Sequence, residues 1–206
     1  MLVISDIVGD TYKQFIKFAY QRSDACMVVL RKHRAKIFRQ EDWLKNFPQY
    51  IPDEETLKRY AIMERESEQD IKLYHTKCLT FMQHLEPFRI KTRHDGMWPS
   101  TAVCCPVGED NLDINLYTLK PEILPYLLEP CSYTNWMYPL YPEDLSFFKN
   151  QHCWAYSSSH EKYIEIVLDR PDEYAYLSDI GIRFKVTNPQ DAYTLDQKVE
   201  RFFEEY

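Results

Sequence analysis

The sequence predicts an α+β fold, a single domain in which a mixed or antiparallel sheet packs with a long helix and several shorter helices. Two observations support this prediction. The strand-like segments follow one another without the regular alternation of strand and helix that builds a parallel sheet. In addition, 206 residues with 45% hydrophobic and 15% aromatic content are enough for one well-packed core. We therefore expect one domain over residues 1–206, with residues 1–86 richer in helix and residues 87–206 richer in strand.

Several segments have the apolar spacing or the start signals of helices. These segments are residues 10–21, 52–85, 121–128, 171–178 and 195–205. Asp10 or Thr11 is expected to cap the first helix. Pro52 and the acidic residues that follow it favour the start of the second, which is preceded by an apolar loop at residues 43–48. Because residues 64–70 are almost wholly charged or polar, we expect the second helix to break there or to cross solvent.

Strands are predicted from short apolar or alternating runs bounded by turn residues. These runs are residues 25–30, 88–93, 102–106, 112–119, 145–148, 153–156, 163–168 and 182–186. Residues 25–30 are wholly apolar, as in a strand buried on both faces, and residues 88–93 alternate as in an edge strand. The polar segment Lys149–Gln151 predicts the turn of a β-hairpin.

The densest group of aromatic residues lies between Trp136 and Glu161. Aromatic density of this kind forms either a core or a recognition surface. The prolines beside Tyr138 and Tyr141 exclude a helix and keep both tyrosines in an ordered loop, so we expect them at the rim of a binding surface. The predicted binding residues are Trp136, Tyr138, Tyr141, Glu143, Asp144, Trp154 and Tyr156.

The charge distribution indicates the kind of partner. The chain has 25 basic and 32 acidic residues, for a net charge of −7. Residues 107–206 hold 18 of these acidic residues and 8 of the basic ones. An acidic surface suits a partner protein with a basic surface and disfavours nucleic acid, although acidic residues also serve simply to keep a domain in solution. The oligomeric state is not indicated.

Two basic segments, residues 31–39 and 89–94, are the candidates for nucleic-acid binding. A run of Lys and Arg can contact phosphates. The competing interpretation is that these cations face solvent or pair with the acidic half of the same chain. Because the chain as a whole is acidic, the competing interpretation is favoured.

No sequence motif indicates a cofactor or a metal. Four glycines and the lack of a glycine-rich phosphate loop exclude the usual nucleotide sites. His152, Cys153 and His160, with Cys131 or the adjacent Cys104 and Cys105, match no common zinc spacing. Neighbouring residues on a strand also point to opposite faces. We expect neither a metal nor a cofactor.

A catalytic alternative uses His160 with Glu161 and Asp144 as an acid–base group. One of the serines at positions 157–159, or a cysteine, would be the nucleophile of a small hydrolase or transferase, but His160 cannot easily reach its sequence neighbour Ser159. The competing interpretation is that Glu143 and Asp144 accept hydrogen bonds from backbone donors near a turn. The capping interpretation is favoured.

The segment Tyr-Pro-Glu-Asp-Leu (141–145), followed by an aromatic strand and Ser-His-Glu (159–161), is similar to segments of small cytosolic bacterial proteins of the immunity or antitoxin kind. The resemblance covers less than a third of the chain and assigns no residue roles. It implies a non-enzymatic, acidic interaction protein of a bacterial defence system. No apolar run is long enough for a membrane span and the N-terminus lacks a basic lead, so we expect a cytoplasmic protein.

Overall fold

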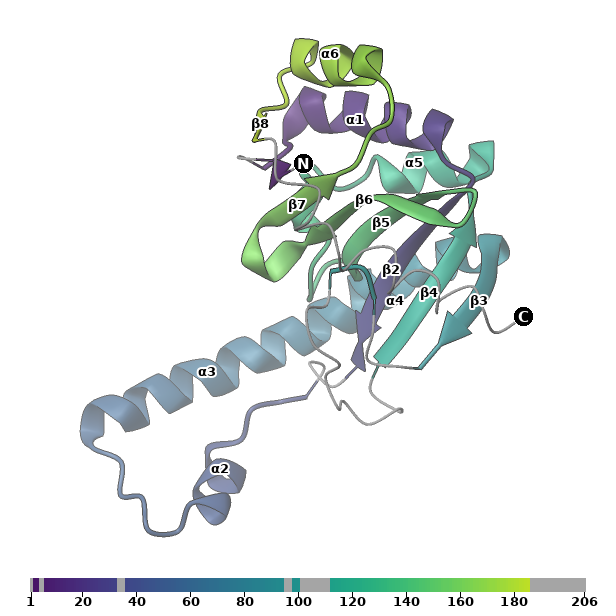
Figure 1. Cartoon of the computed structure of the whole chain (residues 1–206). Helices are drawn as coiled ribbons and strands as arrows, with labels where there is room; N and C mark the ends of the chain where they lie inside the picture. Colours follow the sequence, from purple (N-terminus) through teal and green to yellow (C-terminus); the bar gives the residue numbers. More distant parts are fainter. Residues whose placement is uncertain (1, 4–5, 33–35, 95–97, 101–111, 186–206) are drawn as a thin grey trace.

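A computed structural model describes residues 2–3, 6–32, 36–94, 98–100 and 112–185. It confirms the α+β prediction: one antiparallel sheet packs with a long helix and several shorter ones (Figure 1). The strands are β1 (Leu2–Val3), β2 (Ala25–Arg31), β3 (Arg89–Arg93), β4 (Leu112–Thr118), β5 (Glu143–Lys149), β6 (His152–Ser158), β7 (Tyr163–Ile166) and β8 (Phe184–Lys185). The α-helices are α1 (Gly9–Arg22), α2 (Gln40–Asn46), α3 (Glu54–Leu73), α4 (Leu79–Leu85), α5 (Leu124–Leu127) and α6 (Pro171–Asp179).

The sheet has the order β3-β4-β2-β5-β6-β7-β1-β8, and each neighbouring pair is antiparallel. The apolar strand β2 lies between β4 and β5, and six of its seven residues are buried. β3 lies at the sheet edge, as its alternating sequence predicts. β5 and β6 form the predicted hairpin, in which Asn150 and Gln151 adopt positive φ angles of 48° and 69°.

Two hydrophobic clusters lie on the two faces of the sheet. The larger one joins residues of α1, α4, α5 and α6 to one face, with Phe15, Tyr133 and Trp136 among its buried rings. The second cluster is formed by strand residues together with Trp98, and no described helix contributes to it. β2 contributes to both clusters, through Val28 on one face and Met27 on the other.

Two sequence-based expectations about helices are wrong. Neither Asp10 nor Thr11 caps α1. The residue before α1 is Val8, which forms a β-bridge with Ser132, and the Gly9 amide donates to the carbonyl of Cys131 at 2.8 Å. The first amide of α1 is thus satisfied by a backbone carbonyl, and no side chain caps the helix. The loop expected at residues 43–48 is helical in its first part, because residues 43–46 belong to α2.

The long helix also differs from its prediction. α3 runs through residues 64–70 without a break, and the expected crossing of solvent is confirmed because Thr56 is its one buried residue. The irregularity comes later, at a π-helical turn over Tyr74–Cys78, where the helix reaches the body of the protein and its side chains become buried again. The predicted strand at residues 102–106 and helix at 195–205 lie outside the described residues.

Candidate functional site

The aromatic residues predicted to bind a partner divide into two groups. Trp136, Trp154 and Tyr156 are buried and belong to the hydrophobic clusters. Their polar atoms are used inside the fold: the Trp136 indole donates to the hydroxyl of Tyr12 at 3.0 Å, and the Tyr156 hydroxyl donates to Glu165 at 2.6 Å. These three residues therefore act mainly in the core, and are poor candidates for an exposed binding surface.

Tyr138 and Tyr141 are half-buried at the edge of the body, in the loop that the sequence identifies. The Tyr138 ring lies 5.7 Å from that of Tyr74, and the Tyr141 ring meets Phe81 edge to face at 5.2 Å. The Tyr141 hydroxyl donates to Glu129 at 3.2 Å. Burial, followed by the Glu129 charge, raises the pKa of Tyr141 to about 12.

A groove of about 280 Å³ lies between this loop and the helix that carries the π-helical turn. Its lining consists of Thr76, Lys77, Thr80, Phe81, His84, Glu129, Leu140 and Tyr141. Such a volume is small for a ligand site. The groove therefore marks the junction of helix and loop, and its rim adds Leu140 as an exposed apolar side chain.

Asp144 is fully buried at the start of β5, where its φ angle of 58° places it in the left-handed region. One carboxylate oxygen accepts the backbone N–H of Ser159 at 2.8 Å. The other accepts the Trp98 indole N–H and the Ser100 hydroxyl, each at 2.9 Å. The expectation that Asp144 satisfies a backbone donor near a turn is confirmed. Asp144 also bonds to two side chains and lies near Arg31. We call these residues the Asp144 cluster (Arg31, Trp98, Ser100, Asp144 and Ser159).

Arg31 supplies the positive charge of this cluster from the end of β2. Its Nε lies 2.9 Å from a Glu143 carboxylate oxygen, and its guanidinium nitrogen lies 3.6 Å from Asp144. The guanidinium carbon is 4.9 Å from the centre of the Trp98 ring. Two buried carboxylates thus face one largely buried guanidinium, which limits the cost of burying their charge.

His160 lies beside these carboxylates. One ligand atom each from Glu143, Asp144 and His160 lies within 4.8 Å of the others, and this is the single metal-capable group of three among the described residues. His160 is also 3.7 Å from Glu161, which is exposed to solvent. The structure therefore brings together the predicted catalytic residues His160 and Asp144, with Glu161 at their edge.

The chemistry of this group disfavours catalysis and metal binding. The carboxylate of Asp144 already accepts three hydrogen bonds and faces Arg31, which would repel a cation. An acid–base catalyst must instead be free to exchange a proton with a substrate. Burial raises the pKa of the Cys78 thiol to about 12 and raises that of Cys26 as well, which removes both as thiolate nucleophiles at neutral pH.

The alternative zinc ligands are not brought together. His152 is exposed at the start of β6, whereas Cys153 is buried and its thiol lies 3.6 Å from the carbonyl of Ala155. Cys131 is exposed, and its thiol lies 2.9 Å from the side-chain oxygen of Asn135. Cys104 and Cys105 lie outside the described residues.

The basic segments pair with acidic residues of the same chain. In the first, Lys32 lies 2.9 Å from Asp113, and Arg39 bridges Glu64 and Glu68. In the second, His94 lies 2.8 Å from Asp113, and Arg89 pairs with Glu86 at 2.5 Å. The placement of these charges agrees with the interpretation that they are intramolecular partners, and it weakens the case for a phosphate-binding surface.

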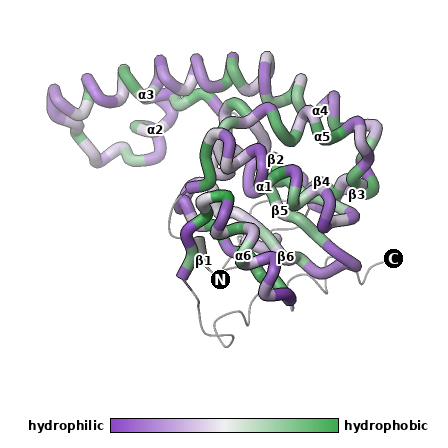
Figure 2. Tube along the Cα trace, turned by 90° about the horizontal axis from the view of Figure 1, so that it is seen from above, coloured by the Kyte–Doolittle hydropathy of each residue, from purple (hydrophilic) through white to green (hydrophobic). Residues whose placement is uncertain are grey.

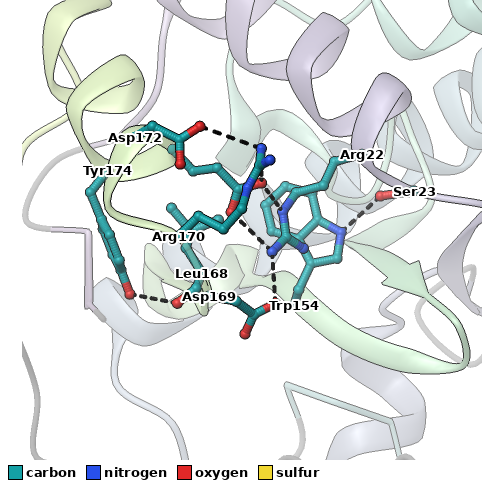
Figure 3. A network of polar contacts seen from close by, with 9 residues as sticks. Arg22, Ser23, Trp154, Leu168, Asp169, Arg170, Asp172 and Tyr174 are labelled. Atoms are coloured by element: carbon teal, nitrogen blue, oxygen red, sulfur yellow. Dashed lines mark hydrogen bonds and ion pairs between the residues drawn. The ribbon is translucent and has the colours of Figure 1, made fainter.

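A second polar cluster, which sequence reasoning missed, joins α1, β6 and α6 (Figure 3). Arg22 donates to the two carboxylate oxygens of Glu173 at 3.0 and 3.1 Å and to Asp169 at 3.2 Å. Its guanidinium carbon lies 4.6 Å from the centre of the Trp154 ring, and the Trp154 indole donates to Ser23 at 2.8 Å. No local signal in the sequence connects these residues, because they come from three distant segments: the end of α1, β6, and the start of α6 with Asp169 just before it.

The Arg22 cluster (Arg22, Ser23, Trp154, Asp169 and Glu173) borders a groove of about 500 Å³. Burial alone would raise the pKa of Glu173, but the hydrogen bonds and charges of Arg22 and Arg170 outweigh it and lower the pKa below the ordinary 4.5. The guanidinium and the buried carboxylate are thus committed to each other. This arrangement ties α6 to α1 and leaves the guanidinium of Arg22 little capacity to bind a ligand.

More than half of the exposed large hydrophobic side chains of the described residues lie on an arm, residues 37–73, that stands away from the sheet. Figure 1 shows α3 extending from the body with α2 beside its far end, and Figure 2 shows the same projection from above. Among the described residues, eight of the fourteen exposed large hydrophobic side chains belong to this arm. They are Ile37, Phe47, Tyr50, Ile51, Leu57, Ile62, Met63 and Leu73.

Comparison with protein-family models, with curated proteins and with solved structures finds no match to this chain. Among the described residues, no helix is both long enough and apolar enough to span a membrane. The function must therefore be argued from the geometry of the body and the arm.

Proposed function

We propose that the chain is a non-enzymatic interaction module that binds a partner protein through its arm. The observation that carries this proposal is the exposure of α3, a helix of 20 residues in which only Thr56 is buried. Packing of an apolar face supplies most of the stability of helices in proteins, and α3 receives little of it from its own chain. Exposed apolar side chains concentrated on one projection mark an interaction site.

The body supports a binding role over a catalytic one. Its buried charges, in the Asp144 and Arg22 clusters, are engaged with one another, as the contacts of Asp144 and Arg22 show. His160 has carboxylates nearby, which keeps a small hydrolase or transferase as the second candidate. That candidate needs a proton acceptor free to act on a substrate, and Asp144 lacks this freedom.

The acidic balance of the chain suits a partner with a basic surface. A role as a bacterial immunity or antitoxin-type protein, acting in the cytoplasm as a defence-system component, is the form of this proposal that the sequence resemblance suggests. In that form the chain would bind another protein and thereby block or recruit it. Nucleic acid is a poorer partner, because Lys32, Arg39 and Arg89 of the basic segments already pair with acidic residues.

The test is capture of a partner by the tagged full-length chain from an extract of its host cells, at low and high salt, with mass spectrometry of the retained proteins. We expect one stoichiometric protein that is lost at high salt. A double variant of the arm, Ile51→Ser with Ile62→Ser, should lose this protein without a change in melting temperature, because both side chains are exposed.

The matched control is Ile90→Ser with Val167→Ser, which changes two exposed apolar residues of the body. The control variant should retain the partner. Equal loss in both variants would show that the arm has no special role, and an unmodified chain that retains nothing would overturn the proposed function and direct attention to His160.

A further inference from the structure

The far end of the arm, residues 46–55, is an ordered segment with exposed apolar side chains, which we call the arm tip. Its exposed side chains are Phe47, Tyr50 and Ile51, and Ile51 is 90% exposed, the highest value among the large hydrophobic residues of the described chain. Isolated exposed apolar residues are ordinary on protein surfaces. Three of them within five residues at the end of a projection form a patch that needs an explanation.

Aromatic contacts with neighbouring residues of the arm, Trp43 and Tyr60, support the arm tip. The Trp43 ring lies 4.7 Å from that of Phe47 and 5.2 Å from those of Tyr50 and Tyr60. The Tyr50 amide donates to the carbonyl of Phe47 at 3.0 Å. Two prolines restrict the loop further, at positions 48 and 52.

A cap closes the tip at its junction with α3. The side chain of Asp53 accepts the backbone N–H of Thr56 at 2.8 Å, which fixes the first turn of the helix. The exposed apolar side chains are therefore presented on an ordered framework. Binding through a framework of this kind loses less conformational entropy than binding through a flexible loop, which is typical of a docking element.

Acidic residues surround the apolar side chains. Residues 41–55 contain one basic residue, Lys45, against five acidic ones, which are Glu41, Asp42, Asp53, Glu54 and Glu55. Lys45 lies 3.5 Å from Asp42, so its charge is already offset. Just beyond this range, Lys58 pairs with Glu54 at 2.7 Å. An apolar centre with a polar rim is the usual anatomy of an interface, and here the rim is predominantly acidic.

We propose that the arm tip is the docking element, an inference that rests on the proposed function. In this arrangement the tip inserts Phe47, Tyr50 and Ile51 into an apolar pocket on a partner protein, and Lys and Arg residues surround that pocket. The charge of the rim favours this occupant. A second copy of the chain would bring one acidic tip against another if the tips met, and a membrane with anionic lipids would repel the same carboxylates.

Photo-crosslinking tests the docking element directly. The full-length chain carries p-benzoylphenylalanine in place of Tyr50 or, as a matched control, in place of Tyr176, an exposed tyrosine of α6. Each protein is irradiated in an extract of the host cells. We expect one adduct with a different protein from position 50 and none from position 176, and we expect the crosslinked peptide of the partner to lie beside Lys or Arg residues.

Point variants sharpen the test. Ile51→Asp should reduce the yield of the adduct about 30-fold, the change expected when a hot-spot side chain is lost, whereas Ile62→Asp on the shaft of α3 should change it less than about 3-fold. Reversing the rim charge with Glu54→Lys and Glu55→Lys should lower the yield at low salt and have less effect at high salt. Circular dichroism of each variant verifies that α3 is retained.

Three results would overturn the inference. The first is an adduct with the mass of two copies of the chain. The second is an adduct yield that does not respond to Ile51→Asp. The third is sedimentation of the chain with phosphatidylcholine vesicles that Ile51→Asp abolishes. Failure of this inference is distinct from failure of the proposed function. If the unmodified chain captures a protein that Ile51→Asp still retains, the chain binds a partner and the tip is not the contact.

Discussion

The body buries most of its apolar side chains, whereas the arm exposes many of them to solvent. In β2, six of seven residues are buried, and every apolar side chain belongs to one of the hydrophobic clusters. In α3, one of 20 residues is buried, and the helix relies on the Asp53 cap and on surface ion pairs such as Lys58 with Glu54. Pairs of this kind contribute only about 0.3–0.5 kcal/mol each. The body therefore holds nearly all of the packing that stabilises the fold, and the arm leaves its apolar side chains available for the proposed binding.

The two regions also treat charge differently. In the body, Arg31 and Arg22 are largely buried and face carboxylates that are themselves buried. On the arm, Arg39 bridges Glu64 and Glu68 at the surface, where solvent screens the attraction. Substitution of a body charge should therefore change folding, whereas substitution of an arm charge should change association.

The largest expected effect is in the Asp144 cluster. Asp144→Ala leaves Arg31 beside a single carboxylate and removes the acceptor of Trp98, Ser100 and the Ser159 amide. We expect the free energy of unfolding to fall by about 3–5 kcal/mol, the range measured when one partner of a buried ion pair is removed. Urea denaturation followed by tryptophan fluorescence measures this change.

The control for that prediction is Asp172→Ala, which changes an exposed aspartate whose carboxylate lies 3.6 Å from Arg170. It should change the free energy of unfolding by less than about 0.5 kcal/mol. A loss below about 1 kcal/mol in Asp144→Ala would show that the body does not depend on this cluster, and would reopen a functional role for Asp144 beside His160.

A smaller effect, dependent on pH, is expected at Glu173. The pKa of Glu173 is lower in the folded chain than its ordinary 4.5, so the ion pair with Arg22 stabilises the fold above about pH 4.5. That contribution is lost as the pH falls through the folded pKa. The difference in unfolding free energy between the unmodified chain and Glu173→Gln should be constant near neutral pH and shrink below pH 4.5. A difference that grows as the pH falls would contradict the lowered pKa.

The smallest effect is expected at the arm tip and should remain local. Asp53→Ala removes the acceptor of the Thr56 amide, so hydrogen exchange in the first turn of α3 should become faster while the melting temperature stays unchanged. Asp70→Ala, which changes an acidic residue of the same helix away from the cap, is the control. A lower melting temperature in Asp53→Ala would mean that the arm and the body unfold as one unit.

Most of the body could be predicted from the sequence because its signals are local. The apolar run at residues 25–30, the alternation at 88–93 and the polar turn at 149–151 each give an element that the structure contains. The start of the long helix could also be predicted, from Pro52 and the acidic residues after it. Local spacing is enough where the periodicity of one segment determines its structure.

The rest could not be predicted because it depends on contacts between distant residues. Nothing in the sequence joins Arg31 to Asp144 or Arg22 to Glu173, and each pair forms only when strands and helices from different parts of the chain meet. Aromatic density predicted either a core or a surface near Trp136, and the fold buries that residue. The exposure of Ile51 likewise follows from the projection of α3, which no local pattern encodes.

The central claim is that the arm binds the partner and the body does not. Hydrogen–deuterium exchange of the full-length chain, with and without the captured protein, tests it most directly. We predict that binding protects amides in residues 46–57 and leaves β2 and β5 unchanged, because these strands are already protected by the sheet. Protection concentrated around His160 or the loop at residues 137–141, with the arm unchanged, would contradict the account.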